Sequence, residues 1–347
     1  MKPKVQFSKF VKELNSKDHI AIFYDSDSDG ICSATITIKS LEKLGHKVER
    51  YIPCSHSNFN PARLKGLKDE GINKIIFLDF SADQYSDFTE NTSLFDAILV
   101  VDHHKIYKDL NSDKIIFIKA QYLRKDLDGS DYCTSKMAFD LFSEVTDVSE
   151  FDWLAAIGTL TDITDDKWQT FLNKVYKKYK TSKKELINAG CIIDAGKQIE
   201  PPQVERALEV VLEAKKYQDI LKSNFSKLYN ELKNEIEFWI SKFEEKAEHK
   251  KDTWIYEIDP SGRIGSTVST LIAIAHPNDT ILITRRQNGW VSINARNHTS
   301  KRAVNDLLEK AVKGLKGANA GGHRPAAGGA VREKDYEEFK KRIWKLA

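Results

Sequence analysis

The chain has 347 residues, of which 41% are hydrophobic, and its formal net charge at pH 7 is +3. This length and apolar content are sufficient for a well-buried core, and the length favours two domains. The four cysteines are far apart and form no C-x-x-C pair, which argues against a structural zinc site and predicts free thiols. We find no secretory signal and no long apolar span, so we expect a cytoplasmic protein without a membrane partner.

Charge is distributed unevenly along the chain. Residues 281–347 contain 15 Lys and Arg against 6 Asp and Glu, a balance of +9, which leaves −6 for residues 1–280. An acidic front part suits metal ions, and a basic tail suits a polyanion such as nucleic acid. A solvated lysine-rich surface is the alternative interpretation, because a nearly neutral total charge neither requires nor excludes a nucleic-acid partner.

Apolar runs alternate with helical spacing through the first 118 residues. The predicted strands are 19–24, 47–52, 74–78, 97–101 and 114–118, and the predicted helices are 7–14, 31–44 and 61–70, with a turn at 25–30. Several strands are apolar on both sides, which predicts an α/β fold with a parallel sheet covered on both faces. Ligand sites in such sheets lie beyond the carboxyl ends of the strands.

The rest of the chain predicts a helical middle and a second, smaller α/β domain. Residues 134–195 are mostly helical, and a long amphipathic helix over 221–243 is predicted to be a connector, with a coiled-coil dimer seam as the alternative. Strand signals return at 254–258, 280–284 and 290–295, with helices at 266–275 and 303–315 and a glycine-rich segment at 317–329. We therefore expect a first domain over 1–198, a helical linker over 199–250 and a second domain over 251–347.

The first apolar strand is followed by the sequence Asp25-x-Asp27-x-Asp29-Gly30. An EF-hand calcium loop is excluded because its twelfth position is Ile36, where a bidentate Glu is required, and because a strand precedes it. A plain acidic turn is the alternative. Three carboxylates within five residues repel one another unless cations or solvent relieve them, so the pattern favours a divalent metal.

Two further strands also end in candidate ligands. Asp79 ends one of them and is positioned to bridge two metals, and Asp102-His103-His104 ends the other. Adjacent histidines are often only surface residues, but these emerge from a buried strand, and a mostly carboxylate set with one imidazole favours manganese or magnesium over zinc. Asp162 would complete the second metal's ligands, with Asp165 and Asp166 as nearby rivals.

These motifs, together with Gly158-x-x-x-Asp162 and the segment Gly321-Gly322-His323-Arg324-Pro325, resemble the DHH phosphoesterase family and its DHHA1 domain. Within that family the chain is most similar to archaeal RecJ-like and nanoRNase-type proteins. The resemblance implies two Mn²⁺ ions, with Mg²⁺ as the other candidate, and the following ligands: Asp25, Asp27 and Asp79 for the first ion, and Asp29, Asp79, His103 and Asp162 for the second. It also implies that Asp102 orients His103 and that His104 touches the scissile phosphate or its leaving oxygen.

The resemblance also implies substrate contacts in the second domain. His323 and the glycine backbone around it would grip a phosphate or a terminal nucleotide, and the implied binding residues are Gly321, Gly322, His323, Arg324, Arg296 and, more weakly, Ser266. Many relatives begin the first motif with His. This chain begins it with Asp25, and RecJ-type members also have Asp there. The chain has no room for the oligonucleotide-binding barrel of bacterial RecJ, so we expect short substrates.

The expected function is hydrolysis of single-stranded RNA or DNA oligonucleotides to nucleoside 5′-monophosphates. One alternative is a small-molecule phosphatase or phosphodiesterase that acts on 3′-phosphoadenosine phosphate or a cyclic dinucleotide. The other is a non-catalytic replication scaffold like the eukaryotic Cdc-type relatives, which lose metal-binding carboxylates that this chain retains. A homodimer, or a replication or repair partner, is also expected from the resemblance.

Overall fold

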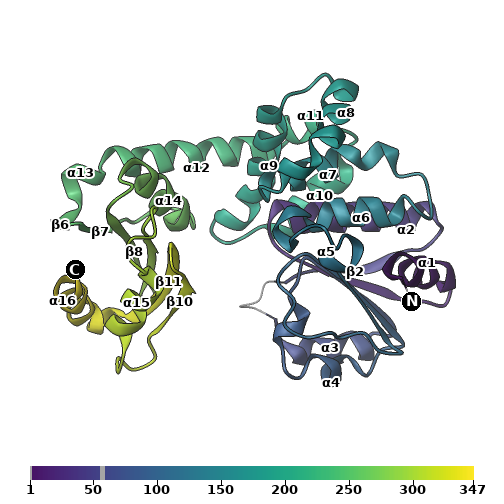
Figure 1. Ribbon diagram of the computed structural model, residues 1–347, viewed down its shortest axis with the longest axis horizontal. Helices are drawn as coiled ribbons and strands as arrows, with labels where there is room; N and C mark the ends of the chain where they lie inside the picture. The colour runs from purple at the N-terminus through teal and green to yellow at the C-terminus, as the bar shows by residue number, and fades with distance from the viewer. Residues whose placement is uncertain (1, 55–58) are drawn as a thin grey trace. The chain divides into compact units, whose positions relative to one another are not determined.

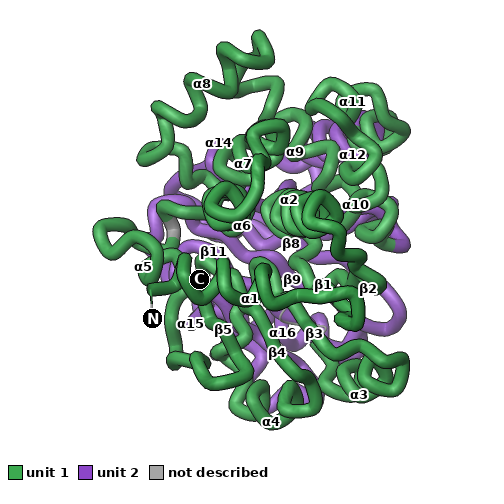
Figure 2. Tube along the Cα trace, turned by 90° about the vertical axis from the view of Figure 1, so that its right-hand side faces the viewer, with its two compact units in different colours: residues 1–197, 202–229 green, residues 198–201, 230–347 purple. Residues whose placement is uncertain are grey.

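The computed structural model describes residues 2–54 and 59–347. The chain forms two compact units, which Figure 2 shows in separate colours. Unit 1 comprises residues 1–197 and 202–229, and unit 2 comprises residues 198–201 and 230–347. No helix in the described part of the chain is long and apolar enough to cross a membrane. The four cysteines, all within these described ranges, form no disulfide.

Unit 1 is built around a five-stranded sheet with the strand order β2-β1-β3-β4-β5. Every pair of neighbouring strands is parallel, so the predicted N-terminal parallel sheet is confirmed. The strands are β1 (Ile20–Tyr24), β2 (Val48–Pro53), β3 (Lys74–Leu78), β4 (Ala97–Asp102) and β5 (Ile115–Lys119). Because the strands are parallel, their carboxyl ends meet at one edge of the sheet.

Alternate residues of β1, β3, β4 and β5 enter two different cores. On β1, Ile22 lies in the core closed by α1, α2, α6, α7, α9 and α10, whereas Phe23 lies in the core closed by α3 and α4. Figure 1 shows α3 and α4 on one face of the sheet and α2, α6 and α7 on the other. These helices are α1 (Pro3–Glu13), α2 (Ser28–Lys43), α3 (Pro61–Asp69), α4 (Phe88–Thr92), α6 (Thr134–Phe142), α7 (Asp152–Thr161), α9 (Lys183–Gln198) and α10 (Val204–Glu213). Burial of both faces explains why β1, β3, β4 and β5 are largely apolar, whereas the edge strand β2 carries charged residues that are not buried.

Unit 1 contains further elements, of which α8 and α11 also bury residues in the first core. They are η1 (Ala82–Gln84), α5 (Ala120–Leu123), η2 (Gly129–Asp131), η3 (Ser149–Phe151), η4 (Asp165–Trp168), α8 (Gln169–Tyr179) and α11 (Tyr217–Leu221).

Several predicted helix boundaries differ from the structure: the helix predicted over 7–14 is α1 (Pro3–Glu13), and the one predicted over 303–315 is α15 (Val304–Val312). Two further differences have a visible cause. Helix α2 begins at Ser28 rather than at residue 31, because Asp27 is its N-cap and Asp27 Oδ1 accepts a hydrogen bond from Gly30 N at 3.0 Å. The long helix predicted over 221–243 is α12 (Asn224–Ser241), which is separate from α11. The chain turns between the two helices at Ser223, whose N and Oγ both donate to the Ile220 oxygen, at 3.1 and 2.7 Å.

Unit 2 contains a mixed sheet with the strand order β10-β11-β9-β8-β7-β6, in which β7 and β8 are parallel and the other pairs are antiparallel. Helices α15 and α16 pack on the face that carries Ile293, and α14 lies on the opposite face, beside Ile283 and Asn294. The elements are β6 (Glu248–Lys250), β7 (Thr253–Glu257), β8 (Thr280–Gln287), β9 (Trp290–Arg296), β10 (Asn319–His323), β11 (Ala326–Arg332), α13 (Phe243–Lys246), α14 (Gly265–Ala275), α15 (Val304–Val312), η5 (Glu333–Asp335) and α16 (Tyr336–Leu346).

The glycine-rich segment forms the hairpin of β10 and β11, which the sequence did not predict as strands. Glycine is unfavourable in strands unless a close backbone approach needs it. Gly322 has a φ of +135°, and a Cβ there would lie 2.6 Å from the Ala326 oxygen, so a larger residue would not fit this pairing. The second domain is α/β, as predicted.

Candidate active site

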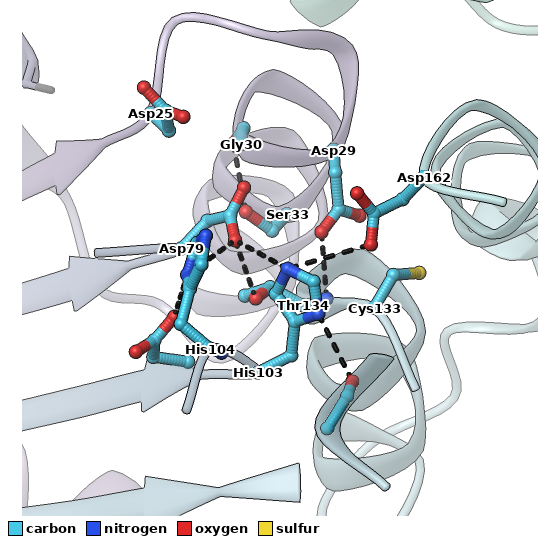
Figure 3. A network of polar contacts seen from close by, with 12 residues as sticks. Asp25, Asp29, Gly30, Ser33, Asp79, His103, His104, Cys133, Thr134 and Asp162 are labelled. Atoms are coloured by element: carbon cyan, nitrogen blue, oxygen red, sulfur yellow. Dashed lines mark hydrogen bonds and ion pairs between the residues drawn. The ribbon is translucent and has the colours of Figure 1, made fainter. Parts of the chain in front are cut away.

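Acidic side chains gather where three neighbouring strands of unit 1 end. Asp25 follows β1, Asp79 follows β3, and Asp102 is the last residue of β4. Asp25 N donates to the Leu78 oxygen at 3.3 Å and Asp79 N donates to the Val101 oxygen at 3.0 Å, which fixes these strand ends side by side. Figure 3 shows Asp25 and Asp79 converging with residues from the neighbouring helices.

The first turn of α2 supplies Asp27 and Asp29 to the same place. Asp29 is buried, and its two carboxylate oxygens accept hydrogen bonds from Thr134 N (2.7 Å) and Ser135 N (2.9 Å) at the first turn of α6. A helix N-terminus favours a carboxylate in this position. Helix α7 passes so closely that a Cβ on Gly158 would lie 2.4 Å from Asp29 Oδ1, which gives the glycine of the Gly-x-x-x-Asp motif a steric reason.

The candidate ligand atoms form three overlapping groups, and within each group they lie within 4.8 Å of one another. The groups are Asp25, Asp27 and Asp79; Asp29, His103 and Asp162; and Asp79, His103 and His104. The structure therefore brings together every residue that the sequence predicted as a metal ligand. Asp79 belongs to two groups, which is the position that a bridging carboxylate needs.

The electrostatics of these groups fit a cation. Burial, followed by the charges of Asp27 and Asp79, raises the pKa of Asp25 to about 8. Burial, followed by the charges of Asp79 and Asp162, raises the pKa of Asp29 to about 8. Carboxyl groups that resist ionisation in this way lose their mutual repulsion when a divalent cation lies between them. The donor set of oxygens with one imidazole therefore fits Mn²⁺ or Mg²⁺.

His103 presents one ring nitrogen to the carboxylates. Its Nδ1 lies 3.2 Å from the carbonyl oxygen of Gly129 and donates to it. The other nitrogen, Nε2, lies 3.3 Å from Asp79 Oδ1 and 3.5 Å from Asp162 Oδ2. A backbone carbonyl that fixes the tautomer in this way leaves Nε2 as the nitrogen for a metal.

The expectation that Asp102 orients His103 is wrong, because Asp102 binds His104 instead. Asp102 Oδ1 accepts hydrogen bonds from His104 Nδ1 at 2.7 Å and from His104 N at 3.2 Å. His103 Nδ1 instead donates to the carbonyl oxygen of Gly129. Burial lowers the pKa of His104, but the hydrogen bond to Asp102 and the charges of Asp102 and Asp79 outweigh it and raise the pKa to about 9. Burial raises the pKa of Asp102, and His104 and Lys119 reverse this, so that its pKa lies well below the usual range.

Two lysines that sequence reasoning missed also lie at this site. Lys119 is fully buried at the end of β5 and bonds to Asp102 Oδ2. Lys197 Nζ lies 3.7 Å from Asp27 Oδ2 and 3.5 Å from Asp194 Oδ1 on the same helix. The three-residue spacing of Asp194 and Lys197 predicts that these two side chains are neighbours on a helix. It does not predict that Lys197 lies beside Asp27, because those two residues are far apart in the chain.

Asp162 lies among the candidate metal ligands, whereas the alternative candidates Asp165 and Asp166 do not. Asp162 is the C-cap of α7, and its carboxylate is turned toward His103. Asp165 instead pairs with Lys183 Nζ at 2.6 Å, and Asp166 is exposed to solvent. Neither rival belongs to any of the three ligand groups.

In unit 2, Arg296 has only neutral partners among the described residues. Its Nη2 donates to Ser266 Oγ at 2.9 Å, its Nε donates to Thr270 Oγ1 at 3.2 Å, and its Nη1 donates to the Ala295 oxygen at 3.0 Å. Burial lowers the pKa of this guanidinium. A half-buried guanidinium that the described carboxylates do not neutralise favours an anion from outside.

The predicted substrate residues Arg296 and His323 lie on one face of the sheet of unit 2. His323 pairs with Ala326, which pairs with Arg296, and residues directly opposite one another on antiparallel strands share a face. Gly321 and Gly328 occupy the neighbouring row and add no side chain to that face. Arg324 directly follows β10, and its Nε donates to the Ser300 oxygen at 2.9 Å.

Comparisons with known proteins match both units. Residues 19–159 match the DHH family, N-terminal domain, and residues 254–347 match the DHHA1 domain.

Among curated proteins, the chain is similar to the single-stranded-DNA-specific exonuclease RecJ of Bacillus subtilis (strain 168). The two are 28% identical over 157 residues, which are 43% of this chain and only 20% of that relative's length. Among solved structures, the chain is similar to a manganese-bound exonuclease RecJ, at 19% identity with a TM-score of 0.78, over 100% of this chain and 94% of that one. It is also similar to RecJ of Thermus thermophilus in complex with Mn²⁺, at 18% identity with a TM-score of 0.74, over 100% of this chain and 55% of that one. These structural likenesses show a shared fold.

Proposed function

The chain belongs to the DHH/DHHA1 family, and from this membership we propose that it is a metal-dependent exonuclease. It would release nucleoside 5′-monophosphates from short single-stranded oligonucleotides. The observation that carries the proposal is the sharing of Asp79 between two of the three ligand groups at one edge of a parallel sheet. The similarity to single-stranded-DNA-specific exonucleases supports the substrate class.

Two overlapping sets of side chains would hold the metal ions. We propose Asp25, Asp27 and Asp79 for the first ion, and Asp29, Asp79, His103 and Asp162 for the second. The first set is one of the observed groups, whereas the second joins the group of Asp29, His103 and Asp162 to Asp79, which is grouped with His103 and His104. We propose Mn²⁺, with Mg²⁺ as the alternative, because the donors are mostly carboxylates with one imidazole. When bound, two such cations supply Lewis-acid stabilisation of phosphoryl charge and lower the pKa of water.

The protein's own contribution to the chemistry centres on His104. Hydrolysis to a 5′-monophosphate adds water across the bond between phosphorus and the 3′-oxygen, so the 3′-oxygen must leave with a proton. His104 Nδ1 donates to Asp102, which leaves Nε2 as the nitrogen available to a phosphate oxygen or to the leaving oxygen. Asp102 is buried and fixes this tautomer and ring orientation.

Unit 2 would bind the strand by its phosphates. Arg296 is held in place by Ser266 and Thr270 and offers its charge to a phosphate. His323 lies on the same face, and the glycines between them let a phosphate or a sugar approach the backbone. Arg324 would contribute charge nearby, although its Nε is already bonded to Ser300.

The test is a time course on end-labelled RNA and DNA of two lengths, with Mn²⁺ and Mg²⁺ in turn. We expect metal-dependent release of 5′-monophosphates from the single strands. Rapid hydrolysis of 3′-phosphoadenosine phosphate or a cyclic dinucleotide, with a short RNA left intact, would contradict the exonuclease assignment and support the small-molecule alternative. The cytoplasmic location, and a homodimer or a replication or repair partner, stay predictions.

A further inference from the structure

Lys119 is a fully buried lysine that contacts the chain segment carrying His103 and His104. It is the last residue of β5, in register with Asp102 on β4, and its exposed fraction is 0%. Its Nζ donates to Asp102 Oδ2 and lies 3.3 Å from the carbonyl oxygens of both His104 and Lys105. One ammonium group therefore contacts the segment that carries the histidines at three points.

Asp83 braces this lysine from a different element. Asp83 lies in η1, is 3% exposed, and its Oδ1 is 3.2 Å from Lys119 Nζ. Its other oxygen accepts from Tyr107 N at 2.6 Å and from Lys108 N at 3.5 Å. Lys119 and Asp83 together therefore fasten both ends of residues 102–108 to the body of unit 1.

Stability alone gives a poor reason for this arrangement. Burying one cation between two carboxylates requires desolvation of three charges, and well-packed apolar residues usually serve stability as well or better. The geometry offers another reason. Asp102 uses Oδ1 for His104 and Oδ2 for Lys119, so without the lysine Oδ2 would be buried without a donor and the carboxylate would be free to rotate away from His104.

We propose that Lys119, braced by Asp83, is a positioning residue that acts through Asp102 to hold His104 in the orientation needed at the scissile phosphate. This inference rests on the proposed function. It assigns Lys119 no contact with substrate or metal, and it predicts a loss of turnover rather than of substrate binding when the lysine is removed.

The test compares two buried lysines of unit 1, Lys119→Met and Lys136→Met. Lys136 is 3% exposed, and its Nζ contacts both carboxylate oxygens of Asp140 and the Trp168 ring (4.1 Å), but not the histidines. For Lys119→Met we expect kcat to fall by about 10- to 100-fold with KM within about twofold of wild type. For Lys136→Met we expect kcat per folded molecule to stay within about twofold of wild type.

Rescue separates positioning from simple loss of structure. In Lys119→Ala, n-propylammonium should restore part of the lost kcat by filling the cavity with a cation, whereas n-butanol should not. A crystal structure of Lys119→Met should show the His104 ring turned away from its wild-type position. An unchanged kcat, or a fall in kcat equal to that of Lys136→Met and unresponsive to the ammonium ion, would overturn the inference, as would an unmoved His104.

The failure of the proposed function would look different. If wild type hydrolyses no oligonucleotide with either metal, the exonuclease proposal fails, while the His104 position in the Lys119→Met structure still decides whether Lys119 sets the ring orientation.

Discussion

The two candidate sites of this chain differ in how firmly their side chains are held. In unit 1, Asp29 and Asp79 are 2% and 4% exposed, and their carboxylates accept hydrogen bonds from α6. In unit 2, the residues from Gly321 to Arg324 are exposed, and the Arg296 guanidinium is held by Ser266, Thr270 and the Ala295 oxygen. The first site is a cluster of carboxylates, several of them buried and hydrogen-bonded. The second is an exposed surface on which the Arg296 guanidinium is fixed by hydrogen bonds.

Because of this difference, we expect mutations in unit 1 and mutations in unit 2 to change different properties of the protein. A rigid cluster of carboxylates needs a cation to relieve its repulsion, so changes in unit 1 should alter metal binding and turnover. An open basic surface gains its order from the substrate, so changes in unit 2 should alter KM while metal binding stays the same.

Asp79→Asn should have the largest effect. Asp79 is shared by two ligand groups, so the change weakens both, and we expect kcat to fall by about a thousandfold or more. Steady-state kinetics in Mn²⁺ would measure this fall. Asp166→Asn is the matched control, since Asp166 is an exposed acid outside the ligand groups and should leave kcat unchanged. Equal activity of the two variants would remove Asp79 from the site.

Arg296→Ala should raise KM for an oligonucleotide by about 10- to 100-fold and leave kcat within a few-fold of wild type. Arg286→Ala is the control, because Arg286 already pairs with Glu257 and Glu333. A titration of initial rate against substrate concentration separates KM from kcat. A fall in kcat without a change in KM would break the proposed division of labour between the two units.

Metal removal should destabilise unit 1 in a pH-dependent way. The folded pKa values of Asp25 and Asp29 are about 8, against 3.8 for the unperturbed group. A raised carboxyl pKa means that these groups stabilise the fold fully below about pH 4 and lose that contribution as the pH rises through about 8. We therefore expect the melting temperature of the metal-free protein to fall between about pH 5 and pH 8.

Added Mn²⁺ should reverse this loss. At a hundredfold excess over its dissociation constant, a bound ion adds about 2.7 kcal/mol to the free energy of unfolding, which corresponds to a rise in melting temperature of roughly 5–10 °C. Calorimetry with and without chelator would measure the shift. Arg296→Ala should show the same shift as wild type, and a melting temperature indifferent to metal at pH 8 would count against a cation site.

Ile163→Gly should have the smallest effect, and in the opposite direction. Ile163 follows Asp162 with a φ of 54°, a left-handed conformation that is unfavourable for a β-branched residue. Glycine removes that strain and should raise the free energy of unfolding by about 1 kcal/mol, measured by urea denaturation. Asn288→Gly in unit 2, at a φ of 53°, is the control, and its effect should be smaller because Asn tolerates this conformation. If both substitutions raise the free energy of unfolding equally, the backbone strain at Ile163, beside the ligand Asp162, is no greater than the strain at Asn288.

Much of unit 1 could be predicted because the signals are local. The apolar runs before Asp25, Asp79 and Asp102 mark parallel strands, and the shared edge of such strands brings the three carboxylates together. The sequence could not show which histidine Asp102 binds, since the deciding partner is the carbonyl of Gly129, 26 residues beyond His103. Lys119 was missed for the same reason.

Unit 2 was less predictable because its features depend on neighbouring strands. The segment around Gly322 has the composition of a loop, yet it forms β10, since glycine permits the backbone of β11 to approach closely. The register that places His323 and Arg296 on one face is likewise a long-range property. The family resemblance, rather than periodicity, pointed to these residues.

The central claim is that the acidic edge of unit 1 binds two divalent cations. Anomalous diffraction at the manganese edge, from crystals grown with Mn²⁺, tests it most directly. We predict two peaks about 3.5–4 Å apart, one beside Asp25 and Asp27 and one beside Asp29 and Asp162, with Asp79 between them. No peak at this edge at saturating Mn²⁺, or peaks only elsewhere in the chain, would contradict the claim.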